Sequence, residues 1–357
     1  MTTEFIWQLP TGSDGRHGDA TFTRRGERAG SHQAFQPGVS DPRGTRFNFF
    51  DYVHQVARAA DLSGFDGIQI QNDPEGDETW IVAGYVARGT RRLKLLTEFD
   101  AARGSAVYAA KNAVSFQRFT GGRFAWQVSV NHDAAQRRRF GDFTADADQL
   151  ERVDEFITVA RGVLTSTSYD FKGRFFEVLN GGFKGPLADK PVPHVYLSGS
   201  SDEALRLSGR QADVHLLDAA PLDDLTASIA ALKKYAQESG RSVTAGLRID
   251  VLARETEEEA VGDALRYWQQ TGKRNDSKAP VTSANLWRDL ATDRSGARGT
   301  LVGSYTQIID RLAEYAAAGI GSFVLGAIPR LEEAYRIGEH VLPALRARLG
   351  NNDRKAA

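Results

Sequence analysis

Eight short apolar runs, nearly all followed by a segment of helical period, constrain the fold of this chain more than any other feature. Strand–helix alternation implies parallel strands joined by crossover helices, because a tight turn cannot connect parallel neighbours. Eight such units that close on themselves form an α/β fold of the (β/α)8, or TIM, barrel class. The predicted strands are residues 5–9, 68–70, 93–97, 124–130, 195–197, 214–217, 247–252 and 323–325.

Helical periodicity fills the segments between these runs. Phe49, Val53 and Val56 share one face of a predicted helix at about 48–63, and Gly64 ends it. The competing fold is a doubly wound open sheet, but the residues after the first strand lack the GxGxxG pattern of its dinucleotide-binding version. We therefore predict a single barrel domain over residues 1–350, followed by a disordered polar tail at 351–357.

Three segments depart from the repeat. Residues 13–46 form a polar insertion after the first strand, and residues 165–193 predict a small hairpin after the fourth. Residues 272–303 form a long polar stretch before the eighth strand. Long loops in compact domains are often functional, so we predict that residues 272–303 form a mobile lid.

Composition excludes several classes of site. The chain has no cysteine, which excludes disulfides, thiolate nucleophiles, zinc–thiolate sites and iron–sulfur clusters. Its histidines show no metal-binding spacing, so no metal is expected. A net charge of -1 gives no reason to expect nucleic acid or an anionic membrane as partner. The sequence shows neither a secretory pattern nor an 18-residue apolar run, and the expected location is the cytoplasm.

Barrel enzymes place their working groups just beyond the C-terminal ends of the strands. These positions supply a set of polar and aromatic candidates. They are Glu98, Phe99 and Asp100 after the third strand, Gln127, Asn131 and His132 at the fourth, Ser198, Gly199, Ser200, Ser201 and Asp202 after the fifth, Asp218 after the sixth, and Arg248 and Asp250 in the seventh.

The segment from Ser198 to Asp202 stands between a strand and a helix. Its backbone N–H groups and hydroxyls at the positive end of a helix dipole suit a phosphate group. The alternative is plain N-capping of the helix by Ser201 or Asp202.

Arg248 and Asp250 are two residues apart on one strand, so their side chains point to the same face. An inward arginine is unfavourable unless it is paired or faces a ligand. Two interpretations stay open, and both can hold together: a buried ion pair between Arg248 and Asp250, or a functional site.

Several motifs resemble the bacterial-luciferase-like flavin monooxygenases, and most closely the alkanesulfonate monooxygenase group. The resemblance spans nearly the whole chain. It is carried by Trp7-Gln8-Leu9-Pro10-Thr11, Thr120-Gly121-Gly122-Arg123, Tyr196-Leu197-Ser198-Gly199-Ser200-Ser201-Asp202, Gly246-Leu247-Arg248-Ile249-Asp250-Val251, Gly299-Thr300-Leu301-Val302-Gly303 and Leu331-Glu332-Glu333-Ala334-Tyr335-Arg336.

The resemblance implies a two-component monooxygenase, a homodimer or homotetramer, that uses O2 and reduced FMN from a separate NAD(P)H-dependent flavin reductase. It implies a small polar substrate, with organosulfur compounds and C–S cleavage among the expected chemistries. By position, the segment from Ser198 to Ser201 would hold the FMN phosphate. Glu98, Phe99 and Gln127 would border the isoalloxazine ring. The implied catalytic residues are Arg248, Asp250, Arg294 and Tyr335, and the implied substrate contacts are Trp80 and Asp218.

Five positions depart from the alkanesulfonate pattern. Gly76 replaces a cysteine, Asp218 replaces a tryptophan, and Asp250 replaces a histidine. Gly12 replaces a histidine in the first-strand loop, and Leu150 replaces a tyrosine near the phosphate. Two added carboxylates disfavour a simple anionic substrate. They would instead accept hydrogen bonds from hydroxyl or amine groups, unless Asp250 only orients Arg248. The alternative functions are an oxidoreductase that uses coenzyme F420 on the same barrel, and a flavin-binding protein without turnover.

Overall fold

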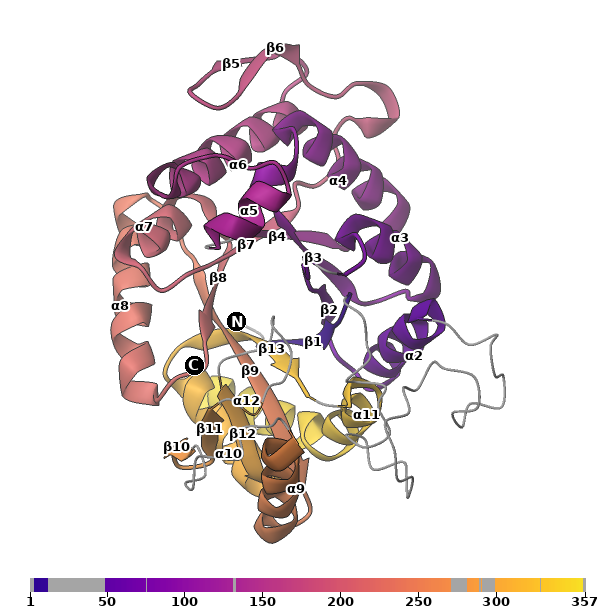
Figure 1. Cartoon of the computed structure of the whole chain (residues 1–357), viewed down its shortest axis with the longest axis vertical. Coiled ribbons are helices and arrows are strands. Elements are labelled where there is room, and N and C mark those ends of the chain that lie inside the picture. Colours follow the sequence, from indigo (N-terminus) through magenta and orange to yellow (C-terminus); the bar gives the residue numbers. More distant parts are fainter. Residues whose placement is uncertain are drawn as a thin grey trace. The chain divides into compact units, whose positions relative to one another are not determined.

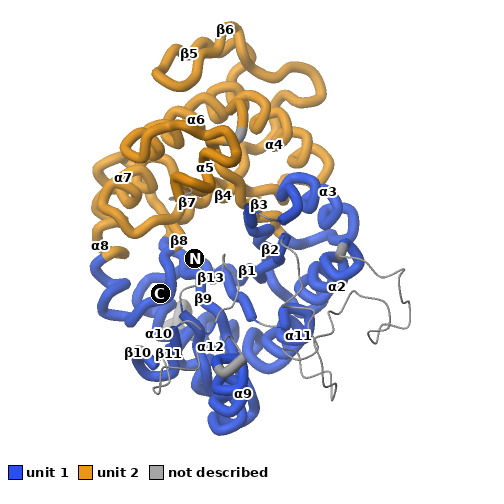
Figure 2. The backbone as a smooth tube through the Cα atoms, in the orientation of Figure 1, with its two compact units in different colours: residues 1–93, 217–227, 245–357 blue, residues 94–216, 228–244 orange. Residues whose placement is uncertain are grey.

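The structure is a computed structural model that describes residues 3–11, 49–74, 76–130, 133–270, 281–288, 290, 299–327 and 329–355. Strands and helices alternate along most of this chain (Figure 1). The chain divides into two compact units (Figure 2). Unit 1 comprises residues 1–93, 217–227 and 245–357, and unit 2 comprises residues 94–216 and 228–244.

The sheet of unit 1 contains five parallel strands. β1 (Glu4–Leu9) pairs with β2 (Gly67–Ile70) on one side and with β13 (Ile320–Gly326) on the other. β13 in turn pairs with the long strand β9 (Thr244–Arg254), which also pairs with β12 (Gly299–Ser304). Because β9 extends beyond β13, its last residues are available to β12.

Unit 2 holds β3 (Lys94–Asp100), β4 (Phe124–Ser129), β7 (His194–Ser198) and most of β8 (Val214–Asp218), and these strands are also parallel neighbours. The full strand order is β10-β11-β12-β9-β13-β1-β2-β3-β4-β7-β8, and β8 also pairs with β9. This closed order of eight parallel strands is that of the (β/α)8 barrel. The predicted fold class is confirmed, and each of the eight predicted strands is present.

Helices follow the strands, and several begin at a side-chain cap. Glu78, Ser105 and Ser201 each accept a backbone N–H at a helix start, and Ser304 forms a capping box with Gln307. Within the described ranges, no helix combines the length and apolar character needed to cross a membrane. The helices are α2 (Phe49–Leu62), α3 (Thr79–Gly89), α4 (Ala106–Thr120), α5 (Ala134–Arg139), α6 (Gln149–Thr165), α7 (Asp202–Gln211), α8 (Leu222–Glu238), α9 (Glu257–Gln270), α10 (Tyr305–Ala317), α11 (Arg330–His340) and α12 (Leu342–Lys355).

The three irregular segments have different outcomes. The predicted hairpin is confirmed as β5 (Tyr169–Lys172) and β6 (Glu177–Gly181), which pair antiparallel in unit 2. The stretch at 272–303 is not only a loop, because it contains β10 (Val281–Ser283), β11 (Leu286–Arg288) and β12. Its remaining residues, except 284, 285 and 290, and the insertion at 13–46 lie outside the described residues.

Strand β12 escaped sequence detection for a physical reason. Two of its six residues are glycines, which weaken a strand signal because they have no side chain to pack. In the structure β12 pairs with β9 on one side and with β11 on the other. Pairing with these neighbours therefore stabilises a strand that its own sequence favours only weakly.

Alternation along the strands separates two faces in each unit. In unit 1, Phe5 stacks on Phe323 with ring centroids 5.5 Å apart, and the Trp7 indole donates to the backbone oxygen of Arg330 in α11. This face of the strands packs on helices. Residues 4, 6 and 8 of β1 lie on the opposite face, since successive side chains of a strand alternate.

Two helix glycines provide a test of the packing of unit 2. A Cβ atom on Gly162 in α6 would collide with the Tyr169 ring of the hairpin, whereas one on Gly262 in α9 would meet only the end of Arg266, 3.8 Å away. Alanine favours helices over glycine by about 1 kcal/mol. Overpacking costs about 1–3 kcal/mol. We therefore expect Gly162→Ala to lower the free energy of unfolding in urea and Gly262→Ala to raise it; equal effects would contradict this packing.

Candidate functional site

Three polar side chains and one glycine lie side by side on four neighbouring strands of unit 1. Strand register places Gln8 of β1 opposite Gln69 of β2, and Gly326 of β13 opposite Asp250 of β9. The pairing of Trp7 with Leu325 brings Gln8 beside Gly326. All three polar side chains are buried. We call Gln69, Gln8, Gly326 and Asp250 the polar row; it lies near the C-terminal ends of its strands, where the fold class places active sites.

Arg248 lies two residues before Asp250 on β9, and its partner is Asp218. The Nη2 and Nε atoms of Arg248 donate to Oδ1 of Asp218, over 2.6 and 3.0 Å. Arg248 therefore forms an ion pair with the end of β8, a partner that the sequence analysis did not name. Since a guanidinium fixed by two hydrogen bonds has little freedom, Asp218 sets the position of the Arg248 charge.

In unit 2, the predicted site residues Glu98 and Gln127 are hydrogen-bonded to each other. They occupy opposed positions on β3 and β4, and Nε2 of Gln127 donates to Oε1 of Glu98 over 2.9 Å. Phe99 lies on the other face of β3. Its ring packs against Trp126 and against Phe156 of α6, with centroids 5.8 and 5.9 Å away. The side chains of Glu98 and Phe99 therefore lie on opposite faces of the strand.

The segment from Ser198 to Ser201 forms a tight turn between β7 and α7. Gly199 has a φ of +136°, and a Cβ atom there would lie 2.8 Å from Cβ of Ala204, so only glycine fits without strain. Ser201 is the N-cap of α7, because its Oγ accepts the N–H of Ala204 over 3.2 Å. The capping interpretation of Ser201 is confirmed, and Ser200 remains an exposed hydroxyl beside the helix start.

A buried histidine holds this turn, and the sequence analysis did not identify it. Nε2 of His215 lies 3.1 Å from the backbone oxygen of Gly199, and Nδ1 lies 2.7 Å from Oγ of Ser208. A carbonyl oxygen only accepts, so Nε2 carries a proton. Both His215 and Ser208 are fully buried. The sequence feature that indicates this residue is a histidine within the apolar run of β8.

Two other predicted site residues lie on helices, and the rest lie outside the described residues. Trp80 is in the first turn of α3, where its backbone N–H donates to the Glu78 carboxylate. Tyr335 lies on α11 with its side chain exposed. Arg294, Asn131 and His132 lie outside the described residues. The described parts of the chain contain no group of three or more histidine, aspartate or glutamate side chains arranged to hold a metal.

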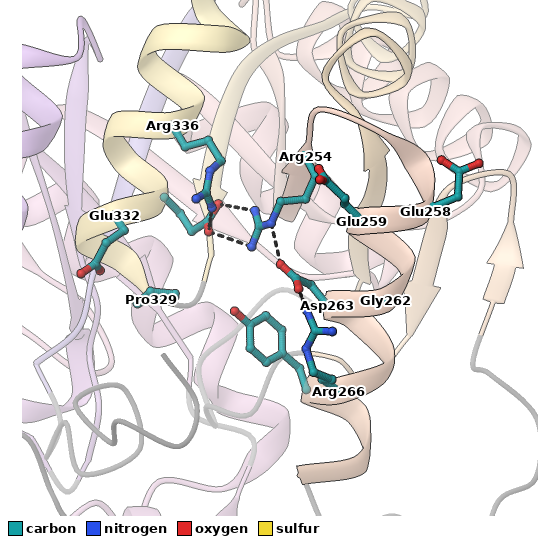
Figure 3. Close-up of a pocket in the computed structure, with 11 residues that line it drawn as sticks. Arg254, Glu258, Glu259, Gly262, Asp263, Arg266, Pro329, Glu332 and Arg336 are labelled. Atoms are coloured by element: carbon teal, nitrogen blue, oxygen red, sulfur yellow. Dashed lines mark hydrogen bonds and ion pairs between the residues drawn. The ribbon is translucent and has the colours of Figure 1, made fainter. Parts of the chain in front are cut away.

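A pocket of about 550 Å³ lies beyond the end of β9, between α9 and α11 (Figure 3). Arg254, the last residue of β9, crosses it. Its Nε lies 2.6 Å from Asp263 of α9, and its two terminal nitrogens each lie 3.1 Å from an oxygen of Glu333 in α11. Arg336 also contacts Glu333, and Arg266 contacts Asp263. Arg254 thus ties both helices to the strand that carries Arg248 and Asp250.

Glu333 is the central acceptor of this network. Burial raises the pKa of the Glu333 carboxyl above its ordinary value, while Arg254 and Arg336 act in the opposite direction. Its side chain is 1% exposed, so water cannot replace it as an acceptor for the two guanidinium groups.

Replacement of Glu333 by methionine tests the network. The variant leaves the donors of Arg254 that face α11 without their acceptor, and loss of one partner of a buried pair costs about 3–5 kcal/mol. We expect a fall of about 3 kcal/mol in the free energy of unfolding, and a smaller fall for Glu333→Gln, which keeps one acceptor oxygen. Glu339→Met, at an exposed position of the same helix, is the control. Equal stability of all three variants would contradict the arrangement.

Several solved structures share this fold. EDTA monooxygenase (EmoA) from Chelativorans sp. BNC1 matches with a TM-score of 0.74 and 16% identity, over 98% of this chain and 94% of that chain. Riboflavin lyase (RcaE) matches at 0.72 and 18% identity, over 98% and 92%. An F420-dependent secondary alcohol dehydrogenase matches at 0.67 and 17% identity, over 97% and 99%. Identities this low establish a shared fold only.

A match to a family model is more specific. Residues 20–322 match the model of the luciferase-like monooxygenases, which covers most of the chain. This confirms the resemblance at the level of the family, while the alkanesulfonate group remains a prediction. The chain belongs to the luciferase-like monooxygenase family, whose fold is shared by oxidoreductases that use FMN or F420.

Proposed function

We propose that this protein is the oxygenating component of a two-component system, which uses O2 and FMN reduced by a separate NAD(P)H-dependent flavin reductase. Its substrate is a small polar molecule, with organosulfur compounds among the candidates. The observation that carries the proposal is the turn from Ser198 to Ser201, at the C-terminal end of a barrel strand and the N-terminus of a ten-residue helix.

The turn fits the phosphate of FMN in three respects. The φ of Gly199 gives a conformation that lets the backbone approach a ligand closely. The start of α7 offers N–H groups and the positive end of a dipole. His215 binds the carbonyl oxygen of Gly199, which removes an acceptor that would repel an anion. Asp202, in the first turn of α7, is engaged by Arg206 and Tyr235, so its charge has partners within the protein.

The remaining residues have binding and electrostatic roles in this proposal. Reduced FMN supplies the electrons that activate O2, and the protein binds, orients and keeps water out. Gln127, held by Glu98, offers a buried amide to the ring. Arg248 provides a fixed positive charge that stabilises developing negative charge. Asp250, Arg294 and Tyr335 are the further catalytic residues of this proposal. Trp80 and Asp218 contact the substrate.

Binding experiments separate this function from the F420 alternative. Under anaerobic conditions, we expect reduced FMN to quench the intrinsic tryptophan fluorescence at a lower concentration than reduced F420. On admission of 18O2, mass spectrometry should detect one labelled oxygen in the product when a substrate panel of sulfonates, sulfones and amines is present. Quenching by F420 alone would refute the proposal. Binding of FMN without incorporation of label from any substrate would favour a flavin-binding protein without turnover.

Substitution of the buried histidine tests the phosphate turn. His215→Phe removes the donor that holds Gly199, and we expect the dissociation constant for FMN to rise about tenfold, which corresponds to about 1.4 kcal/mol. His194→Phe, at the exposed start of β7, should leave FMN binding unchanged. Flavin fluorescence titration measures both, and circular dichroism checks that each variant is folded. Unchanged FMN affinity in a folded His215→Phe protein would remove the turn from the proposed site.

A further inference from the structure

Arg152 of α6 joins two segments of unit 2 that follow neighbouring strands. Its Nη2 atom donates to the backbone oxygen of Ala102 over 3.0 Å, in the short helical turn that follows β3. Its Nη1 atom donates to Oδ1 of Asp142 over 3.1 Å and to Oγ1 of Thr144 over 2.7 Å, in the segment that follows β4. One rigid, planar side chain therefore holds both segments at the C-terminal ends of β3 and β4.

Asp142 is the buried carboxylate that anchors the segment after β4. Its side chain is 4% exposed and accepts hydrogen bonds from the backbone N–H of Thr144 and the amide of Gln149, over 3.0 and 3.1 Å. Nε of Arg137 lies 3.6 Å from the same carboxylate. Burial alone would raise the pKa of the Asp142 carboxyl, but the hydrogen bonds from Thr144 and Gln149 and the charge of Arg152 hold it below its ordinary value. Asp142 is therefore a fixed anion, and Arg152 is one of its partners.

The turn that Arg152 holds is continuous with the end of β3. Oδ1 of Asp100, the last residue of β3, accepts the backbone N–H of Ala102 over 2.9 Å. Two residues before Asp100 lies Glu98, which binds the side chain of Gln127 on β4. Displacement of the turn would therefore displace the end of β3, and with it the pair of Glu98 and Gln127.

We propose that Arg152 is a positioning residue for the flavin ring, which holds the segments after β3 and β4 so that Glu98 and Gln127 are fixed before the ligand binds. Groups that are already ordered bind more tightly, because less conformational entropy is lost during binding. The inference rests on the proposed function, since it requires a flavin ring beside Glu98 and Gln127. The alternative is a purely structural role, in which Arg152 only stabilises the fold.

A second arginine of α6 separates these two roles. The side chain of Arg161 is 23% exposed, compared with 19% for Arg152. It donates to Oε1 and to the backbone oxygen of Gln211 over 2.7 and 2.6 Å, so it binds the last residue of α7 instead of a segment that follows a strand. Arg152→Met and Arg161→Met each remove hydrogen bonds of α6, and we expect both to lower the Tm.

The experiment measures the binding of FMN, and of riboflavin, which lacks the phosphate, to the full chain by flavin fluorescence. Both dissociation constants should rise about fivefold in Arg152→Met and stay unchanged in Arg161→Met, because the two flavins share the ring. In the flavin-free protein, amide hydrogen exchange of residues 98–102 and 142–144 should be faster in Arg152→Met only. Arg152→Lys keeps the charge, but its one nitrogen cannot bind both segments, so this milder variant should show smaller effects of the same kind.

Three results would overturn the inference. These are unchanged hydrogen exchange in Arg152→Met, equal flavin affinity in Arg152→Met and Arg161→Met, and weaker binding of FMN alone, which would assign Arg152 to the phosphate. Each of them leaves the proposed function intact if the wild-type protein binds FMN. A wild-type protein that binds neither flavin would instead refute the proposed function, and the role of Arg152 beside a flavin ring with it.

Discussion

The two-residue period of the barrel strands is the constraint on which the candidate site depends. On β1, Phe5 and Trp7 must pack against helices, and Phe323 of β13 stacks beside them. Their burial fixes the rotation of these strands. It follows that Gln8 and Gly326 lie on the opposite face, where polar residues meet from neighbouring strands. A shift of one residue in register would place Gln8 among the helices and remove the polar row.

Ion pairs secure the ends of the same strands. Arg248 is fixed by Asp218, and Arg254, six residues further along β9, joins α9 and α11 through Asp263 and Glu333. Buried ion pairs of this kind contribute little net stability, but they define geometry because the loss of one partner is costly. In β9, one strand thus carries both a fixed positive charge for chemistry and the anchor of two helices.

In unit 2, a buried histidine fixes the local geometry, as the ion pairs do in unit 1. His215 links the Gly199 carbonyl to Ser208, so the turn before α7 is supported from beneath. Groups that bind a ligand need such support, because a loop positioned only by its own backbone loses part of its binding free energy in becoming ordered. Ser201 meanwhile caps the helix. The start of α7 can therefore be capped by the hydroxyl of Ser201 and still leave the hydroxyl of Ser200 for an anion.

The sequence by itself determined the eight strands, the hairpin and the family, because these depend on local periodicity and on contiguous motifs. It also identified Glu98 and Gln127 as candidate site residues, since both lie on strands of the predicted barrel. Tertiary structure decided what depends on register and on packing between distant segments. It paired Arg248 with Asp218, turned Phe99 to the helices and formed β12 against β9. It also brought Gln8 to Gly326 and Asp250. Side-chain partners across strands are set by register, which no local pattern encodes.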